Sequence, residues 1–141
     1  IVIQINASQI SSFLKSVGSE AYIALEEARR AILDKDMFNI ILNSTCFKID
    51  IIPLNNQDNY EMEKFKNRIK IKFQGREIFV ISPEDLIISK LLWSKSTGGS
   101  ERQLGDCESI YRLNRENLDL NYIKNWVKVL NIEEEFKKVV T

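Results

Sequence analysis

Apolar and polar residues follow two different periods along this chain. Alternation at every second position is typical of strands, and it predicts extended segments at residues 1–5, 21–23, 38–42, 46–54, 69–73 and 76–81. Apolar residues three or four positions apart are typical of amphipathic helices, and they predict helices at about 6–17, 25–32, 60–65, 100–111, 120–129 and 132–140. A helix-start signal followed by a run of apolar residues predicts a further helix at 82–93.

The order of these segments indicates how they combine. Segments 38–42 and 46–54 are separated by Asn-Ser-Thr, which is turn chemistry, so we expect an antiparallel hairpin. Segments 69–73 and 76–81 flank a Gln-Gly pair and predict a second hairpin. The fold class is therefore α+β: a small mixed β-sheet with an antiparallel hairpin, flanking helices and a helical C-terminal part.

The pattern contains no internal repeat and no sign of a second domain. A length of 141 residues suits one packed domain. We therefore expect a single domain over 1–141, with a sheet-containing part at 1–81 and a helical part at 82–141.

Two serines are candidates for helix N-caps. Ser82 precedes a proline, and Asp85 follows three residues later, which is the sequence of a capping box. Ser100 and Gln103 have the same spacing. Residues 94–99 between the two helices are expected to form a loop.

Asp50 is the one carboxylate in the apolar segment 46–54. Alternation places it on one face of a strand with Lys48 and Ile52, while Ile49 and Ile51 take the other face. Burying an ionised carboxylate is costly unless it is paired, hydrogen-bonded or bound to a metal. Two interpretations stay open with about equal weight: a solvated residue paired with Lys48, or a metal ligand.

Lys90 and Asp106 are a second candidate pair. Lys90 lies in a predicted helix that is apolar nearly all round, so its ammonium either follows the apolar surface outward or meets an acid or a phosphate. Asp106 lies in the next predicted helix and is a plausible partner. A buried structural ion pair and a catalytic pair explain this placement equally well when no family is considered.

Composition excludes several functional classes. Twenty basic residues balance twenty acidic ones, which does not support broad electrostatic capture of nucleic acid. The chain has no histidine, so it has no histidine base, triad or metal ligand of its own.

The two cysteines, Cys46 and Cys107, are far apart in the sequence and are expected to be buried apolar residues in a reducing compartment. No run of consecutive apolar residues approaches the length needed to span a bilayer. The expected location is the cytoplasm, with no membrane partner. Tyr22, Trp93 and Trp126 are candidates for stacking a base, and core packing is the preferred interpretation of both tryptophans.

Four segments taken together resemble the nucleotidyltransferase fold of the polymerase-beta type, in its minimal prokaryotic branch of abortive-infection and toxin-like proteins. They are the strand at 1–5, the strand at 47–51, the Ser-Pro-Glu-Asp-Leu turn at 82–86 that leads to Lys90, and the stretch at 101–106. The resemblance covers almost the whole chain and rests on the order and spacing of the segments.

The resemblance implies an activity and a site. In that family three carboxylates hold Mg²⁺ around a nucleoside triphosphate such as ATP, and Asp50 matches the third of them. Lys90 matches a lysine associated with phosphate, and Asp106 matches an acid in the following helix. The implied reaction moves a nucleotide monophosphate onto a hydroxyl of RNA, protein or a small molecule, and the implied partners include a cognate antitoxin.

The chain departs from the family pattern at three places. The family's Gly-Ser turn and Asp-x-Asp pair fall before Ile1, and its Arg-Asp pair reads Gly105-Asp106 here. The chain as given therefore has one of three expected metal ligands and is expected to be inactive, whereas the full-length protein would be active if it carries the others.

We expect aspartates immediately before Ile1 and two residues earlier, on a strand that lies beside the Asp50 strand. The alternative is a non-catalytic binding or regulatory protein of the same fold, such as a toxin–antitoxin component.

Overall fold

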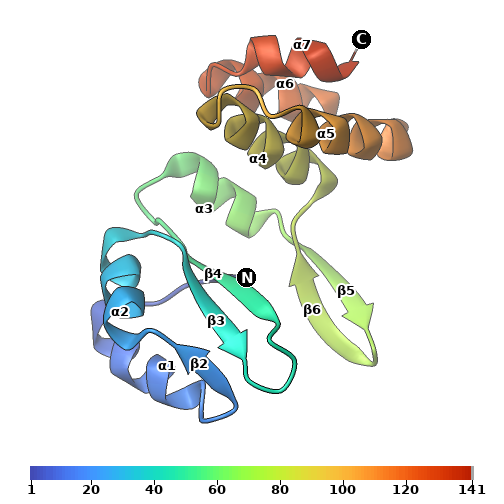
Figure 1. Cartoon of the computed structure of the whole chain (residues 1–141). Helices are drawn as coiled ribbons and strands as arrows, with labels where there is room; N and C mark the ends of the chain where they lie inside the picture. The colour runs from blue at the N-terminus through green and yellow to red at the C-terminus, as the bar shows by residue number, and fades with distance from the viewer. Residues whose placement is uncertain (141) are drawn as a thin grey trace. The chain divides into compact units, whose positions relative to one another are not determined.

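The computed structural model describes residues 1–140, apart from the side chain of residue 7, and has an α+β fold. Seven α-helices, a four-stranded mixed sheet and a two-stranded antiparallel sheet make up the described part (Figure 1). Internal contacts divide the chain into two compact units, Ile1–Met62 and a second that starts at Glu63. This boundary falls inside helix α3 (Asn59–Lys66), so the second hairpin belongs to the same unit as the C-terminal helices.

The first unit contains the four-stranded sheet, in the order β1-β4-β3-β2. Its strands are β1 (Val2–Ile3), β2 (Ala21–Ile23), β3 (Phe38–Leu42) and β4 (Lys48–Pro53). Strands β3 and β4 form the predicted antiparallel hairpin, and β1 pairs with β4 in parallel. The prediction that the first strand lies beside the Asp50 strand is thus confirmed, although β1 is shorter than expected.

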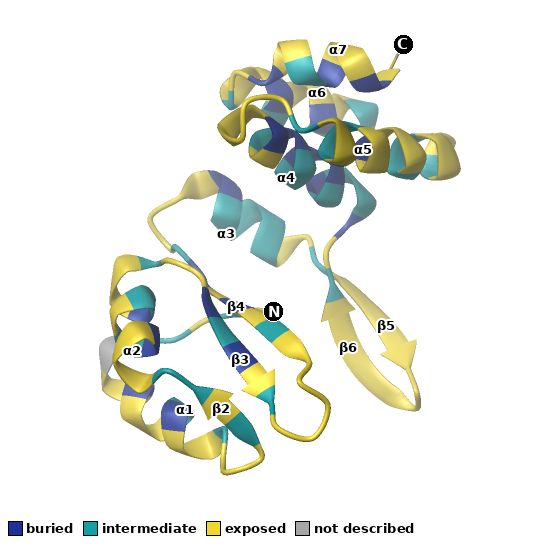
Figure 2. Ribbon diagram, in the orientation of Figure 1, coloured by how far each residue is buried: buried dark blue, intermediate teal, exposed yellow. Residues whose placement is uncertain are grey.

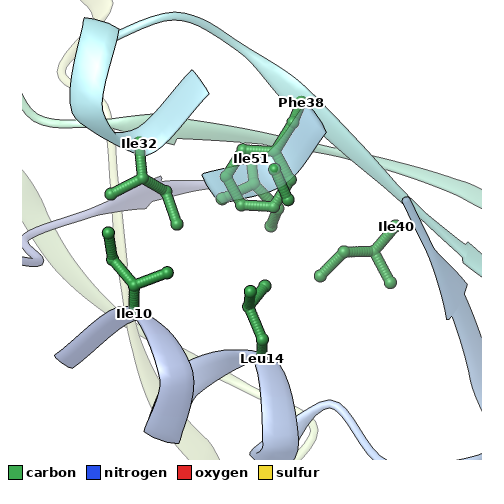
Figure 3. Packing of buried hydrophobic residues seen from close by; sticks show 7 residues of the cluster. Ile10, Leu14, Ile32, Phe38, Ile40 and Ile51 are labelled. Carbon is green, nitrogen blue, oxygen red and sulfur yellow. The ribbon is translucent and has the colours of Figure 1, made fainter. Parts of the chain in front are cut away.

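Helices α1 (Ile10–Ser16) and α2 (Leu25–Asp34) pack on one face of this sheet, and the 3-10 turn η1 (Ala7–Gln9) precedes α1. Apolar residues of both helices and of β3 and β4 point toward one another in the core (Figure 3). Each such burial contributes about 1.5–3 kcal/mol. The buried cluster consists of Ile10, Leu14, Ala28, Ile32, Phe38, Ile40 and Ile51. Leu25, the first apolar residue of the predicted helix at 25–32, is exposed, because α2 starts directly after the edge strand β2.

The second unit contains a hairpin and four helices. The hairpin pairs β5 (Ile69–Phe73) with β6 (Arg76–Val80) as predicted, and nearly all of its residues are exposed (Figure 2). The helices are α4 (Pro83–Ser96), α5 (Glu101–Asn114), α6 (Leu120–Val129) and α7 (Glu133–Val140). Their apolar faces enclose a core of Ile87, Ile88, Leu91, Cys107, Ile123, Val127, Ile132, Phe136 and Val139.

Three expectations about side chains and boundaries were wrong. Helix α4 continues through Ser96 instead of ending before residue 94, and it stops where Gly98 and Gly99 take positive φ. Trp93 was expected in the core but is 55% exposed. Because this helix carries apolar residues on nearly every side, its sequence does not indicate which side faces solvent. Cys46 is exposed because it occupies the β3–β4 turn at a φ of 55°.

The cap at Ser82 forms as predicted. The Asp85 N–H donates to Ser82 Oγ at 3.1 Å, and the Ser82 hydroxyl donates to Asp85 Oδ2 at 2.9 Å. At Ser100 the side chain makes no cap hydrogen bond. Within residues 1–140, no helix combines the length and the apolar character that crossing a membrane requires.

Candidate functional site

Asp50 lies in the middle of β4 on the sheet face that α1 and α2 do not cover. Burial alternates along the strand, with Ile51 buried, Ile49 half-buried, and both Asp50 and Lys48 exposed. The Asp50 side chain keeps 53% of its surface accessible. The carboxylate therefore stays hydrated, and the desolvation cost that a core position would impose does not arise.

Asp50 has two polar neighbours on this exposed face. Asn39, directly opposite on β3, donates from Nδ2 to Asp50 Oδ1 at 2.6 Å. The Lys48 ammonium lies 3.9 Å from the same oxygen. Because the Lys48 side chain is 60% exposed, water screens this ion pair and it is weak. Both contacts use Oδ1, and within residues 1–140 no hydrogen bond reaches Oδ2, so Oδ2 is the oxygen available to a cation.

Strand β1 approaches Asp50 from the other side. Val2 pairs with Ile52, and the nitrogen of Ile1 donates to the backbone oxygen of Asp50 at 2.6 Å. A residue that continued this register two positions before Val2 would lie opposite Asp50. Because residues two apart on a strand share a face, a side chain there would project on the same face as Val2, Ile52 and Asp50.

The residues present are a partial fit for Mg²⁺. Among the described residues no group of three or more aspartates, glutamates or cysteines could hold a metal ion. Mg²⁺ is commonly bound through one or two carboxylates plus substrate phosphates and water. Asp50 can supply one such carboxylate, and the remaining ligands would have to come from phosphate or from further acidic residues.

In the second unit, Lys90 on α4 and Asp106 on α5 meet as predicted. Lys90 Nζ donates to Asp106 Oδ2 at 2.7 Å and to Gln103 Oε1 at 3.2 Å. The lysine side chain is 22% exposed and the aspartate 49%. The pair therefore lies at the edge of two packed helices, with the lysine largely buried and the carboxylate half exposed.

The environment of this pair sets its charges. The hydrogen bond and the positive charge of Lys90 hold the pKa of Asp106 below its ordinary value, with a smaller contribution from Arg102. Cys107 is fully buried in the next position, and burial raises the pKa of its thiol to about 11. The lysine can therefore act as a fixed cation beside an ionised acid, whereas the Cys107 thiol is unsuited to nucleophilic chemistry.

Gln103 has a different partner from the one predicted. Its spacing from Ser100 indicated a capping box, but its side chain instead accepts from Lys90. The lysine thus has two oxygen acceptors on α5, which fix its ammonium at the edge of the α4–α5 contact. The sequence pattern does not distinguish the capping box with Ser100 from the hydrogen bond with Lys90, because both use the side chain of Gln103.

Asp85 is a buried carboxylate that sequence analysis assigned only to a cap. It has no exposed surface, and besides Ser82 it accepts a hydrogen bond from the Tyr122 hydroxyl on α6 at 2.7 Å. Asn67 donates to the same Tyr122 oxygen at 3.1 Å. Burial and the Asp85 contact raise the pKa of Tyr122. This network joins the start of α4 to α6 and is structural in character.

Comparison with known proteins adds no assignment to this site. No family model, no curated protein and no solved structure matches the chain. The interpretation therefore rests on the residues themselves, chiefly Asp50 and Asn39 in the first unit and Lys90 with Asp106 in the second.

Proposed function

We propose that this chain belongs to a Mg²⁺-dependent nucleotidyltransferase of the cytoplasm, which moves a nucleotide monophosphate from a nucleoside triphosphate to a hydroxyl of RNA, protein or a small molecule. The observation that carries the proposal is the parallel pairing of β1 with β4 next to Asp50. It makes the exposed sheet face a place where carboxylates from two neighbouring strands can converge.

The chemistry explains why such convergence matters. Divalent ions that bridge the phosphates and the attacking hydroxyl need several carboxylate oxygens from adjacent positions. Acids immediately before Ile1 and two residues earlier would share a face, and the observed register would set them opposite Asp50 and Lys48. Asp50 would then complete the set of ligands.

Each residue has a role that its surroundings support. We assign Asp50 as a metal ligand, with Asn39 fixing the orientation of its carboxylate. Lys90, which the family resemblance matches to a lysine associated with phosphate, is a partly exposed cation held by Gln103 and Asp106, and we propose it as a phosphate contact of the second unit. Bound Mg²⁺ would supply neutralisation of the phosphate charge. In this proposal Asp50 supplies one carboxylate ligand to the ion.

A second function is favoured by a different observation. Asp50 already has a hydrogen-bond partner and a cationic neighbour, and the described residues contain no three-ligand cluster. A non-catalytic binding or regulatory protein, such as one component of a toxin–antitoxin pair, accounts for those facts without a reaction. In that case the exposed face of the sheet would bind a partner and no metal.

Incubation of the full-length protein with a nucleoside triphosphate labelled at the α-phosphate tests the proposal. We expect Mg²⁺-dependent transfer of label to a hydroxyl acceptor, lost on chelation and in Asp50→Asn. Absence of transfer, together with apolar residues at the two positions upstream of Ile1, would favour the non-catalytic function.

A further inference from the structure

A hollow of about 440 Å³ opens in the first unit between α2 and the first half of β3. Its origin is the shortness of β2, which pairs only with the second half of β3 before the chain turns into α2. The edge of β3 at Phe38 and Asn39 is thus left without a neighbouring strand on that side. Asn39 is one of the lining residues, and its side chain contacts Asp50 across the β3–β4 ladder, so one residue links the hollow to the candidate metal ligand.

Tyr22 forms an aromatic wall of this hollow. It pairs with Ile41 across β2 and β3, which places its ring on the same sheet face as Asn39 and Asp50. Tyr22 is exposed over 60% of its surface. An exposed ring on a rigid strand, next to a polar site, is suited to stacking a planar ligand.

The charges that line the hollow indicate which part of a nucleotide would enter it. The lining residues include three acids, Glu27, Asp34 and Asp36, and one base, Arg30. This excess of negative charge disfavours a triphosphate and favours groups that donate hydrogen bonds. The phosphates would then lie toward Lys48 and Asp50 instead.

We propose that this hollow binds the base of the nucleoside triphosphate, with Tyr22 as its stacking platform. The inference rests on the proposed function and names the substrate end that the first unit recognises. Tyr22 and Asp50 are two strand spacings apart across the sheet and two residues apart along it, which is a span of about 12 Å. A nucleotide with its base on Tyr22 can extend its phosphates along that span.

The same charges select among bases. Carboxylates accept hydrogen bonds from the amino groups of adenine, guanine and cytosine, whereas uracil presents carbonyl oxygens on either side of a single N–H donor. We therefore expect UTP to bind more weakly than ATP, and we expect Asp34→Asn to reduce that difference.

Calorimetric titration of the full-length protein in Mg²⁺ with ATP, UTP and inorganic tripolyphosphate tests the inference. Tyr22→Ala should weaken ATP binding about fivefold or more, the usual effect of losing one base–aromatic stack, and should leave tripolyphosphate binding unchanged. Tyr22→Phe keeps the ring and should bind ATP like the wild type. Phe47→Ala removes another exposed aromatic of the first unit and serves as the matched control.

The outcomes separate the two proposals. ATP binding that is unaltered in Tyr22→Ala, or lost instead in Trp93→Ala, would overturn the base site while leaving a nucleotidyltransferase possible. Failure of the wild type to bind either ATP or tripolyphosphate would overturn both the base site and the proposed function.

Discussion

Asn39 and Asp50 face each other across the β3–β4 ladder, and the amide of Asn39 donates to the carboxylate of Asp50 at 2.6 Å. The contact leaves Asp50 exposed and ionisable while fixing the direction of its carboxylate. Asn39 is also among the residues that line the hollow beside α2, so one residue both borders the hollow and contacts the candidate metal ligand.

Replacing Asp50 with asparagine should abolish Mg²⁺-dependent nucleotide binding in the full-length protein without unfolding it. The amide keeps one oxygen for the Asn39 contact but loses the negative charge that a hard cation requires. Calorimetry with Mg²⁺ and ATP measures the binding, and thermal unfolding measures the fold. Lys48→Met is the matched control at the neighbouring exposed position, where we expect a smaller loss of affinity.

Replacing Lys90 with methionine should remove transfer activity with little change in thermal stability. Asp106 is half exposed, so it stays hydrated when its partner is lost. The pKa of Asp106, held low by Lys90, should rise toward its ordinary value, which carbon-detected NMR titration can follow. Lys124→Met, at an exposed position of α6, is the control. Retained activity with strong destabilisation would show that the pair is purely structural.

Replacing Tyr122 with phenylalanine should destabilise the second unit by about 1–3 kcal/mol, because it removes a hydroxyl donor from a fully buried carboxylate. Urea unfolding measures this change. The ring of Tyr111 packs edge-on against Phe136, so Tyr111→Phe is a matched control for loss of a phenolic oxygen. It should lower the free energy of unfolding by less than Tyr122→Phe does. An equal decrease in the free energy of unfolding of the two variants would show that the hydrogen bond from Tyr122 to Asp85 does not stabilise the second unit.

Alkaline pH should destabilise the fold through Cys107. Burial raises the pKa of its thiol from 9.0 to about 11, so between these values the unfolded chain loses this proton while the folded chain keeps it. Stability contributed by the protonated thiol is therefore complete below pH 9 and declines as pH rises toward 11. Unfolding measured across that range should show a smaller decline in Cys107→Ala. A thiol reagent at neutral pH should modify the exposed Cys46 before Cys107.

The strands and most helices were predictable because their periods were clear, but the register of the central hairpin was not. The expected three-residue turn at 43–45 would have paired Asp50 with Phe38. In the structure Cys46 joins the turn at positive φ, and the added residue moves Asp50 opposite Asn39. One residue of turn length thus decides which side chain holds the candidate ligand.

The second unit shows a different limit. Lys90 and Asp106 could be matched from the sequence because a lone charge on an apolar helix needs an acceptor. The choice between capping and the lysine contact at Gln103, and the exposure of Trp93, depend on how the helices rotate against each other. Local patterns carry no information on that rotation.

The central claim is that a metal–nucleotide complex binds at Asp50 on the exposed sheet face, and paramagnetic NMR tests it most directly. In the isotope-labelled full-length protein with ATP, Mn²⁺ in place of Mg²⁺ should broaden the amide signals of Asp50, Asn39 and Val2 on three adjacent strands. The broadening should vanish in Asp50→Asn. Broadening centred away from β4, or equal broadening in the wild type and in Asp50→Asn, would contradict the claim.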